Sequence, residues 1–127
     1  MKTISNKELA LIGESVAADF LVTNGYQVLC RNFRVKQGEI DLIVEKDQRL
    51  IFVEVKTRSY HSIQSAIDNV TLQKQKHISR VALIYVNQNP KFDNYSTRFD
   101  VIIVLYDEAT NSYNIHHYVD AFEPVLD

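Results

Sequence analysis

Hydrophobic and polar positions follow two different periods along this chain of 127 residues. Apolar residues recur at helical spacing through 9–21, behind a capping box of Ser5 and Glu8 and ahead of Gly25, which suits a helix end. A second helical pattern covers about 69–87. Alternating or continuous apolar runs typical of strands cover 26–33, 39–46, 49–58, 97–106 and 113–119.

The order helix, three strands, helix, two strands predicts an α/β fold, with a mixed sheet of about five strands flanked by helices. The nearly continuous apolar run in 97–106 predicts a strand buried on both faces, and the more polar segment 113–119 predicts an edge strand. A chain of this length suits one domain, expected to span 1–127, and no element is assigned to the tail 120–127.

Composition and charge narrow the class of protein. The hydrophobic content of 46% and charged content of 24% are ordinary for a globular domain. The net charge of −2 argues against a protein that coats nucleic acid non-specifically, although not against a local basic face. The single cysteine, Cys30, excludes an internal disulfide, and its apolar setting predicts an inert buried thiol. The sequence shows neither the apolar core of a signal peptide nor an apolar run long enough to span a bilayer. We therefore expect a cytoplasmic protein with no membrane partner.

The most informative stretch covers 38–58 and predicts a hairpin with the two-residue turn 47–48. In that register Asp41 lies directly across from Glu54, and Lys56 lies one pleat beyond Glu54 on the same face. The opposite face of the hairpin is wholly apolar in its middle and forms the predicted core: Ile40, Leu42, Val44, Ile51, Val53 and Val55.

Two carboxylates opposed across a sheet repel each other, and burying them increases that cost. A divalent cation between them removes the repulsion, and Mg²⁺ prefers such oxygen ligands, with Lys56 close enough to contact a bound water or a phosphate. The spacing by itself favours a plainer interpretation, a solvated face on which Glu39 and Lys56 form an ordinary cross-strand pair. A one-residue slip in register would also separate the two acids.

Several short motifs, taken together and in this order, resemble the uncharacterised bacterial YraN family. They lie within about 12–104 and comprise Gly13-Glu14, Gly-Glu-Ile-Asp-Leu-Ile at 38–43, Phe-Val-Glu-Val-Lys-Thr-Arg at 52–58, Val70-Thr71 with Lys74-Gln75, and Arg-Phe-Asp-Val-Ile at 98–102. That family is similar to archaeal Holliday-junction resolvases of the PD-(D/E)XK nuclease superfamily. The resemblance implies a restriction-endonuclease-like fold, in which the acids converge at one edge of the sheet.

The superfamily motif corresponds to Asp41, Glu54 and Lys56, and the helix-borne acid of the resolvase-like branch corresponds to Glu14. The resemblance implies metal-assisted hydrolysis of phosphodiesters. Asp41, Glu54 and the carbonyl of Val55 would hold Mg²⁺ or Mn²⁺, and Glu14 would assist them. The ion would polarise the phosphate and acidify a bound water, and Lys56 would position that water or stabilise the transition state.

Further residues are assigned by the resemblance and by their chemistry. Backbone-phosphate contacts are expected from Lys74, Gln75, Arg58, Arg34, Lys36 and Arg31, although each of them also suits a solvated surface. Asp100 follows Arg98 at the start of a buried strand, where a structural pair is expected rather than a metal ligand. No metal-ligand spacing relates the histidines, which are His61, His77, His116 and His117.

Three functions remain open from the sequence. A metal-dependent endonuclease acting on DNA, including branched DNA, is favoured because Glu14, Asp41, Glu54 and Lys56 are all present. The second is a non-catalytic nucleic-acid-binding or scaffold protein that retains the nuclease fold, and the third is a structural protein that binds another protein through this face. Because resolvase-like enzymes are usually two-fold dimers, the resemblance also implies a homodimer.

Overall fold

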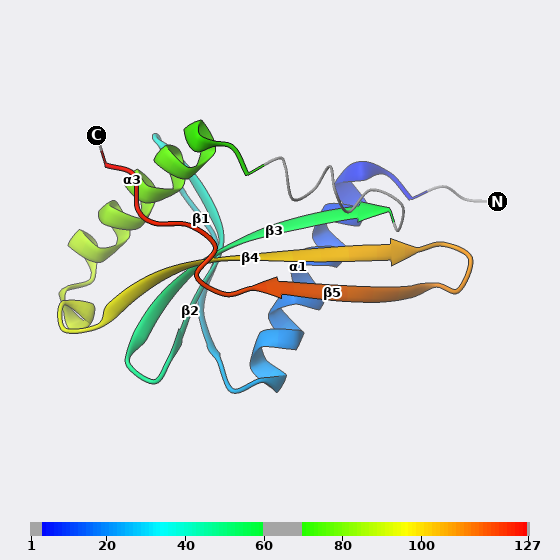
Figure 1. Ribbon diagram of the computed structural model, residues 1–127, viewed down its shortest axis with the longest axis horizontal. Coiled ribbons are helices and arrows are strands. Elements are labelled where there is room, and N and C mark those ends of the chain that lie inside the picture. Colours follow the sequence, from blue (N-terminus) through cyan, green and yellow to red (C-terminus); the bar gives the residue numbers. More distant parts are fainter. Residues whose placement is uncertain (1–3, 60–69, 127) are drawn as a thin grey trace.

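The computed structural model describes residues 4–59 and 70–126. It confirms the predicted mixed sheet, whose strand order is β1-β2-β3-β4-β5 (Figure 1). The central pair β3 and β4 is parallel, and the other neighbouring pairs are antiparallel. The strands are β1 (Gln27–Val35), β2 (Gly38–Lys46), β3 (Arg49–Ser59), β4 (Ser96–Asp107) and β5 (Ser112–Tyr118). The helices are α1 (Asn6–Thr23), α3 (Leu72–Gln88) and the 3₁₀ turn η1 (Pro90–Phe92).

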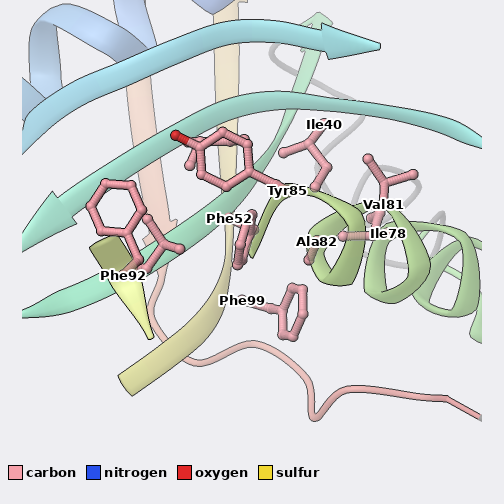
Figure 2. Packing of buried hydrophobic residues seen from close by; sticks show 10 residues of the cluster. Ile40, Phe52, Ile78, Val81, Ala82, Tyr85, Phe92 and Phe99 are labelled. Carbon is pink, nitrogen blue, oxygen red and sulfur yellow. The ribbon is translucent and has the colours of Figure 1, made fainter. Parts of the chain in front are cut away.

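The two long helices cover opposite faces of the sheet (Figure 1). The core under α1 consists of Ala17, Ala18, Leu21, Leu42, Val44, Ile51, Val53, Ile102 and Val104. The core under α3 is richer in aromatic residues (Figure 2) and consists of Ile40, Ile43, Leu50, Phe52, Ile78, Val81, Ala82, Tyr85, Phe92 and Phe99. Neither long helix has the length and apolar character needed to cross a membrane.

The first helix begins as predicted, because the Oγ of Ser5 accepts the backbone N–H of Glu8 at 3.1 Å. In its middle, α1 lies directly on β3. A Cβ added to Gly13 would overlap the Oγ1 of Thr57 and lie 2.7 Å from its Cγ2. The missing side chain at Gly13 therefore sets how closely the helix approaches the sheet.

The β2–β3 hairpin has the predicted turn and register. Asp47 and Gln48 have φ values of 53° and 61°, as the favoured two-residue hairpin turn requires. Strand pairing runs from Lys46 opposite Arg49 to Leu42 opposite Val53. At that point the ladder ends, because the Asp41 side chain, rather than a backbone carbonyl of β2, accepts the N–H of Val55 at 2.8 Å. The cross-strand pair of Glu39 and Lys56 is not formed, since Glu39 binds Arg34 of β1 at 2.8 Å.

Ile40 is a core residue as predicted, but the face of the sheet assigned to it is wrong. Ile40 packs under α3 with Ile43, and Leu42 packs under α1 with Val44. Strict alternation of side chains therefore fails around Asp41, where β2 leaves β3.

Other differences concern the ends of elements. The second helix begins at Leu72 rather than near 69, after the N-cap Thr71, whose Oγ1 accepts the N–H of Lys74 at 3.2 Å. Strand β1 continues to Val35, beyond the predicted strand 26–33. The connection between α3 and β4 contains the buried Phe92.

The C-terminal segment packs along the α3 side of the sheet (Figure 1). Phe122 stacks on Phe99 with ring centroids 5.0 Å apart, and the N–H of Val125 donates to the Oγ of Ser79 at 2.9 Å. The tail to which the sequence assigned no element thus completes the core below α3.

Candidate active site

Charged side chains from four elements converge where the β2–β3 ladder ends. Asp41 comes from β2, Glu54 and Lys56 from β3, Glu14 from α1 and Lys74 from α3. Glu14, Glu54 and Lys56 are buried, with exposed fractions of 8%, 7% and 9%. Because buried charges are costly unless they are paired or bind an ion, the interpretation as a solvated charged face is wrong for these residues.

Asp41 takes the place of a backbone group of β2. Its Oδ2 accepts a hydrogen bond from the backbone N–H of Val55. In an antiparallel ladder, the N–H and the C=O of one residue point toward the same neighbouring strand. The carbonyl of Val55 is therefore expected on the Asp41 side. Burial and the charge of Glu54 raise the pKa of Asp41 from 3.8 to about 7, although the hydrogen bond from Val55 opposes this.

Glu54 is compensated by two lysines. The Nζ of Lys74 lies 2.8 Å from its Oε1, and the Nζ of Lys56 lies 3.5 Å from the same oxygen. Burial lowers the pKa of the Lys56 ammonium, and the adjacent Lys74 lowers it further. Burial also lowers the pKa of Lys74, but the hydrogen bond to Glu54, the contact with Lys56 and the charges of Glu54 and Asp41 together outweigh it, and the net pKa is raised. The shorter of the two ion pairs thus belongs to the lysine from the helix rather than to the lysine of the hairpin motif.

Glu14 reaches the site because Gly13 lets α1 approach Thr57. Its Oε1 accepts a hydrogen bond from the Nδ2 of Asn32 at 2.6 Å and lies 3.5 Å from a guanidinium nitrogen of Arg31. Asn32 has a left-handed backbone with φ of 55°, which asparagine tolerates better than most residues. Glu14 is thus held by β1 in this state.

A cavity of about 710 Å³ opens beside these groups. Its polar lining includes Glu14, Asp41, Lys56, Thr57 and Arg58. Glu54 is not part of that lining and meets Lys74 instead. A ligand in the cavity would therefore reach Asp41 and Lys56 first.

The donor set suits a hard divalent cation. Asp41, Glu54 and the Val55 carbonyl offer oxygen ligands. Burial raises the pKa of Asp41, and repulsion from the charge of Glu54 raises it further. A cation of charge two would relieve that repulsion. Within residues 4–59 and 70–126, however, no three His, Cys, Asp or Glu side chains form a group that could hold a metal ion. Water or phosphate oxygens would have to complete the coordination, as is usual for Mg²⁺.

Comparison with known proteins assigns the family. Residues 13–104 match the model of Uncharacterised protein family UPF0102. The chain belongs to this family. The matched region contains Glu14, Asp41, Glu54, Lys56 and Lys74. UPF0102 is the YraN family that the motifs indicated, so that expectation is confirmed.

Several UPF0102 proteins are similar over nearly their whole length. One from Caldicellulosiruptor bescii is 39% identical over 116 residues, which cover 91% of this chain and 98% of the relative. One from Syntrophomonas wolfei is 38% identical over 117 residues, covering 92% and 99%. One from Clostridium botulinum strain Loch Maree is 36% identical over 118 residues, covering 93% and 96%.

Most of the phosphate-contacting residues expected in this UPF0102 chain bind their own chain. Arg31 contacts Glu14, and Arg34 contacts Glu39. A guanidinium nitrogen of Arg58 donates to the carbonyl of Thr57 at 2.8 Å, and the Nε2 of Gln75 donates to that of Val70 at 3.1 Å. Lys74 is engaged by Glu54, whereas Lys36 is exposed in the β1–β2 turn.

The sequence did not identify the residues that hold the site together from a distance. Asn32 and the contact of Gly13 with Thr57 were both missed. The signals were weak: an asparagine within a strand and a glycine within a helix.

The structural role expected for Asp100 is confirmed. It is fully buried, accepts two hydrogen bonds from Arg98 at 2.8 and 2.9 Å, and lies 2.7 Å from the Nε2 of His117. Of the other histidines, His61 lies outside the described residues. Cys30 is half-buried rather than fully buried, and burial raises the pKa of its thiol, as expected of an unreactive group.

Proposed function

We propose that this UPF0102 protein is a metal-dependent endonuclease that hydrolyses DNA phosphodiesters, including those of branched DNA. The observation that carries the proposal is the convergence of the buried Glu54 and Lys56 with the half-buried Asp41 at the end of a hairpin, beside a cavity that Asp41 and Lys56 line. A largely buried carboxylate pair with a neighbouring ammonium is costly to maintain for a purely structural purpose.

Each residue has a distinct role in this proposal. Asp41, Glu54 and the Val55 carbonyl would hold Mg²⁺ or Mn²⁺, with Glu14 adding negative potential from α1. The ion, when bound, would supply the Lewis acidity that polarises the phosphate. Lys56 would donate to a phosphate oxygen of the transition state from within the cavity lining. Lys74 would compensate Glu54 whenever the cation is absent.

Cleavage assays on labelled duplex, single-stranded and four-way-junction DNA test the proposal. With millimolar Mg²⁺ or Mn²⁺ we expect cutting by the wild type and a loss of about 100-fold or more in Asp41→Asn, Glu54→Gln and Lys56→Ala. Asp19→Asn is the matched control, because Asp19 is an exposed carboxylate on α1 outside the candidate site. No cutting of any substrate with either metal ion would overturn the proposal.

A second function is favoured by one observation. Two lysines already compensate Glu54, and no three-ligand group is found among the described residues, as expected if the site no longer takes a metal ion. The chain would then bind nucleic acid without cutting it. This alternative predicts no heat of Mn²⁺ binding in isothermal titration, and salt-sensitive DNA binding that Glu54→Gln leaves unchanged.

A further inference from the structure

Positive charge is concentrated in two segments of the chain. Residues 28–38 carry Arg31, Arg34 and Lys36, and α3 carries Lys74, Lys76 and Arg80, with no Asp or Glu in either segment. The rest of the chain holds eight Lys and Arg against all 16 Asp and Glu, a balance of −8, although the whole molecule carries only −2. Charge is therefore strongly segregated in a protein that is nearly neutral overall.

The fold brings the end of the first basic segment, which carries Lys36, to α3, whereas Arg31 pairs with Glu14 on the α1 side of the sheet. The β1–β2 turn packs against α3, where a Cβ on Gly38 would lie 3.3 Å from the Cγ2 of Val81. Lys76 and Arg80 are four residues apart on α3, so they share one face of the helix. Within residues 4–59 and 70–126 neither of them forms an ion pair or a side-chain hydrogen bond. Two like charges side by side without a counter-ion favour an external anion.

This face leads directly to the candidate active site. A groove of about 430 Å³ runs over Leu72, Gln73, Lys76, His77 and Arg80. A second depression, between α3 and the start of β2, shares Gln73 and His77 with it and reaches Lys74, the partner of Glu54. Its lining also includes Glu39, whose charge is compensated by Arg34. The lining of the two depressions thus leads from Arg80 to Lys74, which pairs with Glu54.

The length of the surface from Lys74 to Arg80 fits a short piece of nucleic-acid backbone. A helix rises about 1.5 Å per residue, so Lys74 and Arg80 lie about 9 Å apart along the axis of α3. One strand of DNA carries a phosphate about every 3.4 Å of helix axis. The surface therefore spans about two to three phosphates.

We propose that this face of α3, formed by Gln73, Lys76, His77 and Arg80 and here called the α3 basic face, binds the DNA backbone that flanks the largely buried acid pair. The choice of DNA as the ligand rests on the proposed function. The test does not, because it measures binding in the absence of metal. Lys76 and Arg80 contact phosphates, and Gln73 and His77 offer hydrogen-bond donors between them. DNA is favoured over an acidic protein because the groove runs to a site whose residues suit phosphodiester chemistry.

Fluorescence anisotropy with labelled duplex DNA in EDTA measures binding without cutting. The variant Lys76→Gln/Arg80→Gln removes two charges and keeps good helix formers on an exposed helix face. The matched control Arg49→Gln/Lys91→Gln removes two exposed charges near the start of β3 and in η1, away from the site. Between 50 and 200 mM salt, we expect the α3 variant to lose about two units of salt slope and about tenfold in affinity per cation at 0.1 M salt. The control should stay within about twofold.

Equal weakening of the two double variants would show that net charge matters and position does not, and would overturn the inference. So would unchanged binding by the α3 variant in a protein that melts like the wild type. Displacement of DNA by poly-glutamate at equal charge concentration would assign the face to an acidic protein instead. If the α3 variant alone is weakened but no cleavage is found, the catalytic proposal fails and the inference stands.

Discussion

The charge on the Asp41 carboxylate is favoured by one contact and disfavoured by its surroundings. The carboxylate completes the backbone pairing of Val55, yet it is desolvated and faces the charge of Glu54. Its pKa is consequently raised to about 7. Between about pH 4 and about pH 7, Asp41 is protonated in the folded chain and ionised in the unfolded chain. The free energy of unfolding therefore falls as pH rises through that window.

Replacing Asp41 with Asn should therefore stabilise the metal-free protein at pH 8, because Asn keeps an oxygen for the Val55 N–H and carries no charge. The gain is bounded by about 4 kcal/mol, at about 1.4 kcal/mol for each unit of pKa. Thermal melts in EDTA at pH 8 and pH 5 should show a large difference between Asp41→Asn and wild type at pH 8 and a smaller one at pH 5. Asp19→Asn, on an exposed position of α1, is the control. A difference that does not change with pH would contradict the assigned cause.

The residues of the hairpin site could be predicted because their relation is local. Two positive-φ residues in the turn fix the register, and alternation then places Glu54 and Lys56 on one face. The ion pair between Lys74 and Glu54 could not be predicted in the same way. It depends on how far α3 reaches along the sheet, which no local pattern contains.

At the scale of elements, the approach of α1 to β3 decides whether Glu14 reaches the site. The contact between Gly13 and Thr57 leaves no room for a methyl group. The failure to predict the place of Ile40 has a related origin. The Ile40 side chain lies on the α3 side because β2 separates from β3 near Asp41. That separation depends on the hydrogen bond from the Val55 N–H to the Asp41 carboxylate.

We expect Gly13→Ala to destabilise the protein by about 1–3 kcal/mol through overpacking, even though Ala favours a helix by about 1 kcal/mol. Urea denaturation monitored by circular dichroism would measure this. The double variant Gly13→Ala/Thr57→Ala should recover part of the loss, because it removes the Oγ1 and Cγ2 that the new methyl group meets. Asp19→Ala controls for helix propensity on the exposed face. A neutral or stabilising effect of Gly13→Ala would contradict the tight contact.

At the scale of the whole molecule, a buried network ties distant parts of the chain together. Asp100 of β4 binds Arg98, His117 of β5 and the backbone N–H of Asp120, and Arg98 donates to the hydroxyl of Tyr26 after α1 at 3.2 Å. Burial raises the pKa of Asp100, but the hydrogen bonds from His117 and Arg98 outweigh it and hold the pKa below its usual range. The network therefore stabilises the fold above pH 4, and its contribution is lost as pH falls through the lowered pKa.

Asp100→Asn should cost about 3–5 kcal/mol at pH 7, since it leaves the largely buried Arg98 without its counter-charge. Thermal melts at pH 7 and at a pH below the lowered pKa of Asp100 should show this penalty shrinking at the acid pH, because wild-type Asp100 is then neutral too. Mn²⁺ binding should not change, because the network and the acid pair share no side chain. The exposed Asp93→Asn is the control. An equal penalty at both pH values would show that shape, and not charge, holds the network.

The parallel pairing of β3 with β4 has a consequence for the order in which the chain acquires structure. Strands β1, β2 and β3 are joined by short turns, so their contacts close small loops, whereas Arg49 meets Ser96 only after the whole crossover has been placed. Closing the larger loop costs more entropy and slows folding. Asp41 and Glu54 are therefore brought together early on the hairpin, and Lys74 arrives later with the crossover helix. We expect Glu54 to keep its hydration until α3 docks, because only then does Lys74 reach it.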